Sequence, residues 1–175
     1  NNPTSQAGNI VNEIQPYKDK LIMLTQAGVY LFNPEQETFS PLTRNEDINE
    51  QLSRPYQFET FLIDSKERLW LADSKGGLLR IHMTDNSLHR YYTNAQDSSS
   101  IGKFRIVNIM ENSKGEIYFG TIGSGLFKYI PDSDSFCQYG LGNNALPSDY
   151  CYYICESPIY HHLLILHSKG FSLFD

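Results

Sequence analysis

The chain has 175 residues, of which 40% are hydrophobic and 13% aromatic, and its formal net charge is −6. This apolar content is enough for a packed core and argues against disorder. The acidic balance, with lysine and arginine scattered along the chain, argues against binding to nucleic acid or to an anionic membrane. No apolar stretch reaches the roughly 18 residues that a membrane span needs, so we expect no direct membrane contact in this chain.

Short apolar and aromatic segments separated by turn formers predict β-strands in four units, at 9–42, 57–92, 104–139 and 150–175. The expected strands are 9–14, 21–25, 29–33 and 38–42 in the first unit, then 57–63, 69–72, 78–82 and 88–92 in the second. They continue with 106–110, 117–121, 126–130 and 136–139 in the third unit, and with 152–155, 163–167 and 171–174 in the fourth. Helical signals are nearly absent, although Thr43–Gln51 in the first connection has the composition of a helical turn.

The units repeat at a fixed interval. Leu21, Leu69 and Ile117 hold equivalent places 48 residues apart, and Gly125 and Gly170 are 45 apart. Four short strands at a period of roughly 40–50 residues are typical of a β-propeller. The sequence therefore predicts an all-β, partial β-propeller of about four blades, each a four-stranded antiparallel sheet, with an incomplete last blade.

The turns and inner strands support blades that stack face to face. Gly28, Gly77, Gly125 and Gly170 each lie directly before a third strand, which predicts a positive φ or a close approach between backbones. Leu21–Leu24 is apolar at every position, as expected for a strand covered on both faces.

Two arrangements of the blades remain open. Propellers close into rings of about four to eight blades, so the chain is either a four-bladed ring or an arc of a larger one. The missing outer strand of the last unit favours the arc. We expect its ends to be covered by the rest of a parent propeller or by a second copy of the chain.

The third unit, ENSKGEIYFGTIGSGLFKYIPDSDSFCQY, resembles the two-component regulator propeller repeat. The matching positions are Glu111, Gly115, Ile117, Tyr118, Phe119, Gly120, Thr121, Gly125, Leu126 and Tyr129. The second unit matches at Asp64, Leu69, Trp70, Leu71, Gly76, Gly77 and Leu78, but has Ala72-Asp73 in place of Gly-Thr. The first and fourth units are more degenerate.

The resemblance implies a periplasmic, ligand-sensing part of a hybrid histidine kinase/response regulator of the Bacteroides type, an inner-membrane protein that detects oligosaccharides. The kinase chemistry would then lie outside this chain, which is expected not to be an enzyme. A non-catalytic protein-interaction scaffold and a fragment of a propeller enzyme, such as a polysaccharide lyase, are the alternatives. A membrane helix and kinase further along the parent gene would favour the sensor over the scaffold.

Residues with the potential for chemistry have simpler structural explanations. The acids Asp64, Asp85, Glu111, Asp132 and Asp134 lie in turns that recur with the repeat, which favours a role in the turns over paired-carboxylate catalysis. His161 and His162 are adjacent in a turn and point apart, so with His167 they form a poor zinc site. Cys137, Cys151 and Cys155 are expected to be buried thiols, with the last two on one side of a strand but too far apart to pair.

We therefore predict no catalytic residues, no cofactor and no metal. Trp70 and Tyr118 occupy equivalent places and are expected to pack between blades, the alternative being a platform on which a sugar stacks. Loops that join the second and third strands share one face of a propeller. The side chains predicted to face a partner there are Gln26, Ser74, Lys75, Ser124, Ser168 and Lys169.

Overall fold

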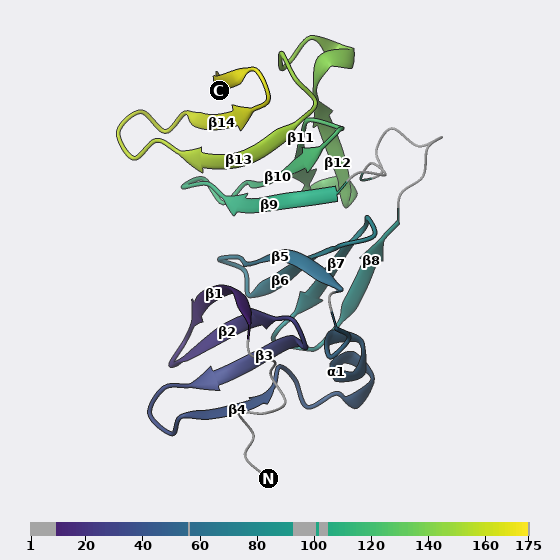
Figure 1. Cartoon of the computed structure of the whole chain (residues 1–175), viewed down its shortest axis with the longest axis vertical. Coiled ribbons are helices and arrows are strands. Elements are labelled where there is room, and N and C mark those ends of the chain that lie inside the picture. Colours follow the sequence, from purple (N-terminus) through teal and green to yellow (C-terminus); the bar gives the residue numbers. More distant parts are fainter. Residues whose placement is uncertain (1–9, 56, 93–100, 102–104, 175) are drawn as a thin grey trace.

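The computed structural model describes residues 10–55, 57–92, 101 and 105–174. Within these ranges the chain forms four antiparallel sheets that follow one another along the sequence (Figure 1). The first two blades contain β1 (Val11–Tyr17), β2 (Lys20–Thr25), β3 (Gly28–Asn33), β4 (Thr38–Pro41), β5 (Phe58–Ile63), β6 (Arg68–Asp73), β7 (Leu78–His82) and β8 (Leu88–Tyr91). The last two contain β9 (Arg105–Glu111), β10 (Ile117–Ile122), β11 (Leu126–Ile130), β12 (Ser135–Tyr139), β13 (Cys151–Glu156), β14 (Leu163–His167) and β15 (Gly170–Phe174).

Each of the first three sheets has four strands in sequence order, and the fourth has three, β13-β14-β15. These sheets confirm the predicted all-β fold with an incomplete last blade. Figure 1 shows the first and fourth sheets at opposite ends of the stack, so the described residues form an open arc. The predicted unit boundaries at Asn9, Phe104 and Asp175 lie outside the described residues.

Three separate apolar layers hold the blades together, one between each pair of neighbours. The first layer includes Ile22 of the first blade and Phe61 of the second, both fully buried. The second is aromatic and contains Trp70 and Phe119, and the third packs Tyr118 against Ile165. Each large apolar side chain so buried contributes roughly 1.5–3 kcal/mol to folding. Trp70 is 0% and Tyr118 is 4% exposed, which rules out a sugar platform at either ring.

Polar side chains on the inner strands reach from one blade to the backbone of the next. Glu13 of β1 accepts hydrogen bonds from Thr60 Oγ1 at 2.8 Å and from the Phe61 amide at 3.1 Å on β5. Asn108 of β9 makes the corresponding contact with the Ile154 amide of β13 at 2.9 Å. These bonds satisfy backbone groups that the sheets leave unpaired, and they fix the register between blades.

A second device links the hairpin turns of successive blades. Glu111, at the end of β9, accepts from both the amide and the hydroxyl of Ser65 in the second blade. Glu156, at the end of β13, does the same for Ser113, at 2.7 Å in each case. Glu111 thus links the third blade to the hairpin turn of the second. Asp64, which we matched to it from sequence, instead accepts from amides of its own turn, as Asn112 does one blade later.

The contact between the second and third blades contains a charged cluster at the edge of the aromatic layer, with the side chain of Arg80 13% and that of Asp134 40% exposed. Arg80 donates to Asp134 at 2.6 Å and to the Tyr129 hydroxyl at 2.6 Å, and it lies over the Trp70 ring. Tyr91 and Tyr129 also donate to Asp134 Oδ1, at 2.6 and 2.7 Å. Burial would raise the pKa of Asp134, but these three donors outweigh that effect and hold its pKa at about 2.

The connection between the first two blades contains the helix α1 (Glu46–Leu52), which overlaps the segment in which we predicted a helical turn. Asn45 caps its first turn by accepting from the Ile48 amide at 3.2 Å. Ile48 and Leu52 are buried in the first apolar layer, so the helix is fixed against both blades. None of the described helices is long and apolar enough to cross a membrane.

The four turn glycines adopt positive φ, as the sequence predicted. A Cβ at Gly125 would lie 2.2 Å from the Tyr139 carbonyl oxygen, and one at Gly28 would lie 2.1 Å from that of Leu52. At Gly77 the nearest atom would be at 3.4 Å, and at Gly170, where the blade has no outer strand, nothing lies within 4 Å. Two of these glycines are therefore required by a close approach as well as by their φ.

We predict that Gly125→Ala destabilises the chain far more than Gly77→Ala. Both substitutions place a Cβ at positive φ, for a cost of about 1 kcal/mol or slightly more, but only the first also drives the new carbon into backbone, for a total loss above about 3 kcal/mol. Urea unfolding followed by circular dichroism measures both changes. Equal losses would show that conformational strain alone accounts for the requirement.

We also predict that Asp134→Asn reduces the sensitivity of the fold to acid. Because the pKa of Asp134 is depressed to about 2, its ionised form contributes stability that is complete above about pH 4, its ordinary titration range, and is lost as the pH falls toward 2. The variant should melt at a lower temperature near pH 7, with a difference from the wild type that shrinks toward pH 2.

Asp132→Asn is the matched control, since Asp132 is an exposed acid in the same turn, two residues before Asp134. It should leave the melting temperature and its pH dependence unchanged. A difference between wild type and Asp134→Asn that stays constant from pH 6 to pH 2 would contradict the assignment.

Candidate functional site

Three of the side chains predicted to face a partner occupy equivalent turns. In each of these turns a backbone amide donates to the carbonyl of the residue directly before the inner strand of the same blade. The pairs are Gln26 to Ile10, Ser74 to Gln57, and Ser168 to Tyr150. Lys75, Ser168 and Lys169 are exposed, and Gln26 and Ser74 are half-buried. The repeat thus brings these turns to the same edge of their blades.

Ser124 is different, because it is buried and cannot present its side chain to a partner. Its amide donates to Thr121 Oγ1 and its carbonyl accepts from Gln138 Nε2. The following connection closes over the turn, since the amides of Gly123 and Gly125 both donate to the Asp149 carbonyl. The expectation that Ser124 is a surface residue is wrong for this reason.

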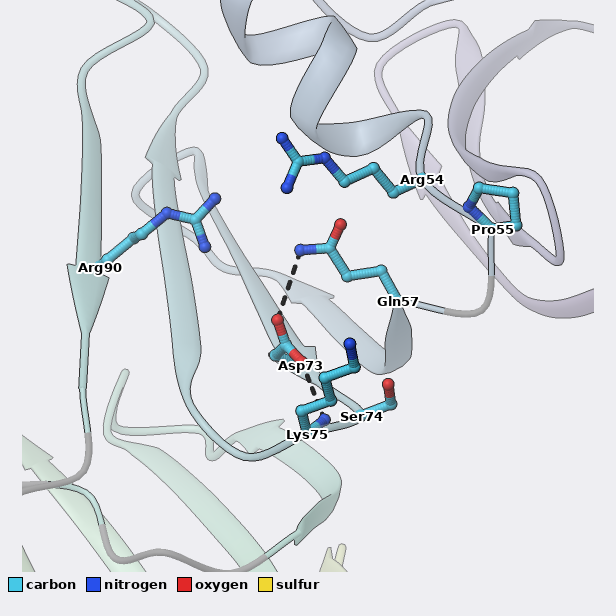
Figure 2. Close-up of a pocket in the computed structure, with 7 residues that line it drawn as sticks. All are labelled: Arg54, Pro55, Gln57, Asp73, Ser74, Lys75 and Arg90. Atoms are coloured by element: carbon cyan, nitrogen blue, oxygen red, sulfur yellow. Dashed lines mark hydrogen bonds between the residues drawn. The ribbon is translucent and has the colours of Figure 1, made fainter.

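A polar pocket of about 500 Å³ opens beside the β6–β7 turn. Its walls come from the segment between α1 and β5, from that turn, and from the outer strand β8 (Figure 2). The lining residues are Arg54, Pro55, Gln57, Asp73, Ser74, Lys75 and Arg90. Two of the predicted partner-facing residues, Ser74 and Lys75, therefore belong to one concave site.

Local hydrogen bonds set the floor of this pocket. Asp73 ends β6 and accepts from the Lys75 amide at 2.8 Å and from Gln57 Nε2 at 3.3 Å. The Ser74 amide donates to the Gln57 carbonyl at 2.7 Å, which ties the turn to the segment before β5. Lys75 is left with its side chain exposed at the rim.

Two arginines approach the pocket from opposite walls. Figure 2 shows the guanidinium groups of Arg54 and Arg90 extending toward the same space above the Gln57 amide. Arg90, on β8, donates through Nη2 to Gln51 Oε1 on α1, so the helix helps to orient it. Arg54 follows the same helix by two residues.

The charge in the pocket is unbalanced. Arg54, Lys75 and Arg90 contribute three positive charges against the single carboxylate of Asp73. Among the residues that the structure describes, none of the three cations forms a salt bridge. Gln57 Oε1 is buried without a hydrogen-bond partner in the same part of the chain. The site thus offers donors and positive potential to an incoming group.

Sequence reasoning missed Arg54, Gln57 and Arg90 as site residues. Arg54 and Gln57 lie in the connection before the second blade and Arg90 lies on its last strand, 36 residues after Arg54. Their convergence depends on how α1 turns the chain toward β8. The only signal in the sequence was an unusually long connection between the first two units.

The histidines of the fourth blade do not converge. His161 lies in a turn, with its Nδ1 3.5 Å from Glu156 Oε1. His167 Nε2 forms a hydrogen bond with Ser172 Oγ at 2.9 Å. No group of three or more potential metal ligands occurs among the described residues.

The cysteines are free thiols. Cys151 is buried against the third blade, and burial raises the pKa of its thiol to about 12. Cys137 is exposed, contrary to our expectation. A β-bulge between Cys151 and Tyr153 also shifts the alternation of β13, so Cys151 faces the third blade together with Ile154, and Cys155 does not.

The fold is similar to that of several solved bacterial structures. One is an extracellular domain attributed to a hybrid two-component system of B. thetaiotaomicron, with a TM-score of 0.71 and 19% identity over 97% of this chain. Another, attributed to a one-component system of the same organism, has a TM-score of 0.69 and 17% identity over 94% of the chain. The chain spans 22% and 21% of those two structures, or about a fifth of their length.

A third similar structure is PorZ, a surface component of the type-IX secretion system of Porphyromonas gingivalis, with a TM-score of 0.55 and 13% identity over 94% of this chain and 32% of PorZ. Comparisons with protein-family models and with curated proteins find no match. The structural likeness establishes the propeller fold, and its neighbours include extracellular domains of the kind that the repeats resemble.

Proposed function

We propose that the chain is part of an extracytoplasmic propeller that senses a ligand for a two-component system. The observation that carries this proposal is the match of nearly the whole chain to an extracellular domain attributed to a hybrid two-component system. The repeat pattern around Tyr118 and Gly125 supports the same conclusion from sequence. The parent protein would be an inner-membrane histidine kinase with this region in the periplasm, and the ligand an oligosaccharide.

The role of this chain would be binding and not catalysis. The polar pocket contains one carboxylate, Asp73, whereas hydrolysis of a glycosidic bond commonly uses two. A signal then requires only that the ligand prefer one arrangement of the sensor over another. Arg54 enters the pocket from the connection between two blades and Arg90 from an outer strand, so a ligand that contacts both would favour one placement of these elements.

A second candidate function is a non-catalytic scaffold at the cell envelope. The likeness to PorZ, a surface component of a secretion system, favours this alternative to a limited degree because its TM-score and identity are lower. A scaffold would use the apolar ends of the arc and would not require the pocket.

The outward face of the fourth blade, formed by Tyr153, Leu166, Phe171 and Leu173, is apolar and 50–72% exposed. Tyr153, Leu166 and Phe171 lie side by side in the ladder. At each of the three contacts between blades in this chain, the apolar face of one sheet is covered by the neighbouring sheet. We therefore propose that a further blade of the parent protein covers this one.

We predict that amide hydrogen exchange in β13–β15 is at least about 10-fold slower in the parent extracellular region than in the 175-residue chain, because a covering blade buries the exposed face and stabilises the sheet against local opening. Unchanged exchange would contradict the proposal. So would a concentration-dependent dimer of this chain that Phe171→Glu abolishes, since the occupant would then be a second copy.

The sensing function predicts that an oligosaccharide raises the melting temperature of the parent extracellular region and changes autophosphorylation of the parent kinase. A thermal-shift screen of oligosaccharide fractions identifies the ligand, and a phosphorylation assay in membrane vesicles measures the response. A ligand that stabilises the region without any change in phosphorylation would contradict sensing. A parent protein without a kinase would favour the scaffold.

A further inference from the structure

We propose that the pocket between Arg54 and Arg90 binds an acidic saccharide, a sugar that carries a carboxylate or sulfate group. The saccharide part of this inference rests on the proposed sensing function, whereas the anionic part rests on the pocket itself. The site is built by residues of this chain from the segment before β5, the β6–β7 turn and β8.

The charge of the pocket opposes that of the whole chain. The chain has 20 acidic and 14 basic residues and a net charge of −6, yet the pocket has three basic side chains and one acid. Like charges gathered in one concavity repel each other, and a bound anion would offset this repulsion. Because no described carboxylate forms a salt bridge with these cations, a bound anion would supply the missing charge.

The geometry suits an oxyanion that belongs to a larger molecule. A guanidinium group offers a planar fork of donors that matches carboxylate and sulfate oxygens, and here two such groups reach the same space (Figure 2).

The size and lining of the pocket favour a sugar over a simple ion. Its volume of about 500 Å³ falls within the range of small-molecule sites, which is roughly 300–1,000 Å³. Most of its lining side chains are polar, which suits a ligand rich in hydroxyl groups. A smaller adjoining cavity of about 50 Å³ shares Asp73 and Arg90 and adds Tyr91 and Tyr92.

Tyr92 adds an aromatic surface at the adjoining cavity. Its side chain is 74% exposed, unlike the buried Trp70 and Tyr118. An aromatic ring has an apolar face and a polar tip, which suits contact with the mixed surface of a sugar ring. Positive charge and an accessible ring thus occur together at one edge of the second blade.

The test is isothermal titration calorimetry on the 175-residue chain. The probes are galacturonate di- to tetrasaccharides and galactose 6-sulfate. Their neutral counterparts are the methyl-esterified oligomers and galactose, and sodium sulfate represents the ion alone. We expect at least one acidic sugar to bind at least about 10-fold more tightly than its neutral counterpart, with an affinity that falls as salt is added.

The double variant Arg54→Ala/Lys75→Ala should weaken this binding by at least about 10-fold, because each cation removed takes away a charge-assisted contact. The matched control is Arg44→Ala/Lys169→Ala. It removes the same charges from the other end of the α1 connection and from the equivalent turn of the fourth blade. Circular dichroism melts confirm that both variants are folded, and the control should bind as the wild type does.

Each alternative outcome overturns the inference. If neutral and acidic sugars bind equally, or none binds, the pocket is not an acidic-saccharide site. If sodium sulfate binds as tightly as the acidic sugars, it is a site for small anions only. Calorimetry measures binding to the pocket, and phosphorylation of the parent kinase measures sensing. An absence of binding here would therefore overturn the acidic-saccharide site alone, and an absence of a phosphorylation response would overturn the sensing function alone.

Discussion

The packing of one sheet against the next is the constraint on which the rest of this structure depends. A four-stranded sheet with apolar residues on both faces cannot bury them by itself, so each blade depends on packing against a neighbour. The chain meets this requirement three times, with a separate apolar layer at each contact. The same requirement explains why β6 and β10 have buried residues at five of six positions, where an ordinary half-exposed strand would alternate.

Polar contacts give these apolar layers their register. Hydrophobic packing is not directional, so it permits small slips between sheets. The bonds from Glu13 and Asn108 to the next inner strand, and those from Glu111 and Glu156 to the preceding hairpin, act at defined atoms along the stack. The partly exposed Arg80–Asp134 ion pair is a further polar contact of this kind, near the rim of the interface between the second and third blades.

The repeat predicted much of this arrangement from sequence. The 48-residue spacing of Leu21, Leu69 and Ile117 predicted the blades, and the glycines before each third strand predicted the positive φ. The matching of Asp64 with Glu111 was wrong by one position, because the 48-residue spacing pairs Asp64 with Asn112, and these two residues make the same turn hydrogen bonds. Arg54 and Arg90 were missed because their meeting depends on the path of a connection, and periodicity says nothing about connections.

The candidate site lies where the chain departs from its own repeat. Between the first two blades the connection forms α1, which brings Arg54 to the β6–β7 turn and holds Arg90 through Gln51. Between the third and fourth blades the connection closes over the corresponding turn and buries Ser124. Turns that are equivalent in the repeat therefore differ in access. The regular sheets determine which loops share an edge, and the irregular connections determine which of those loops can meet a ligand.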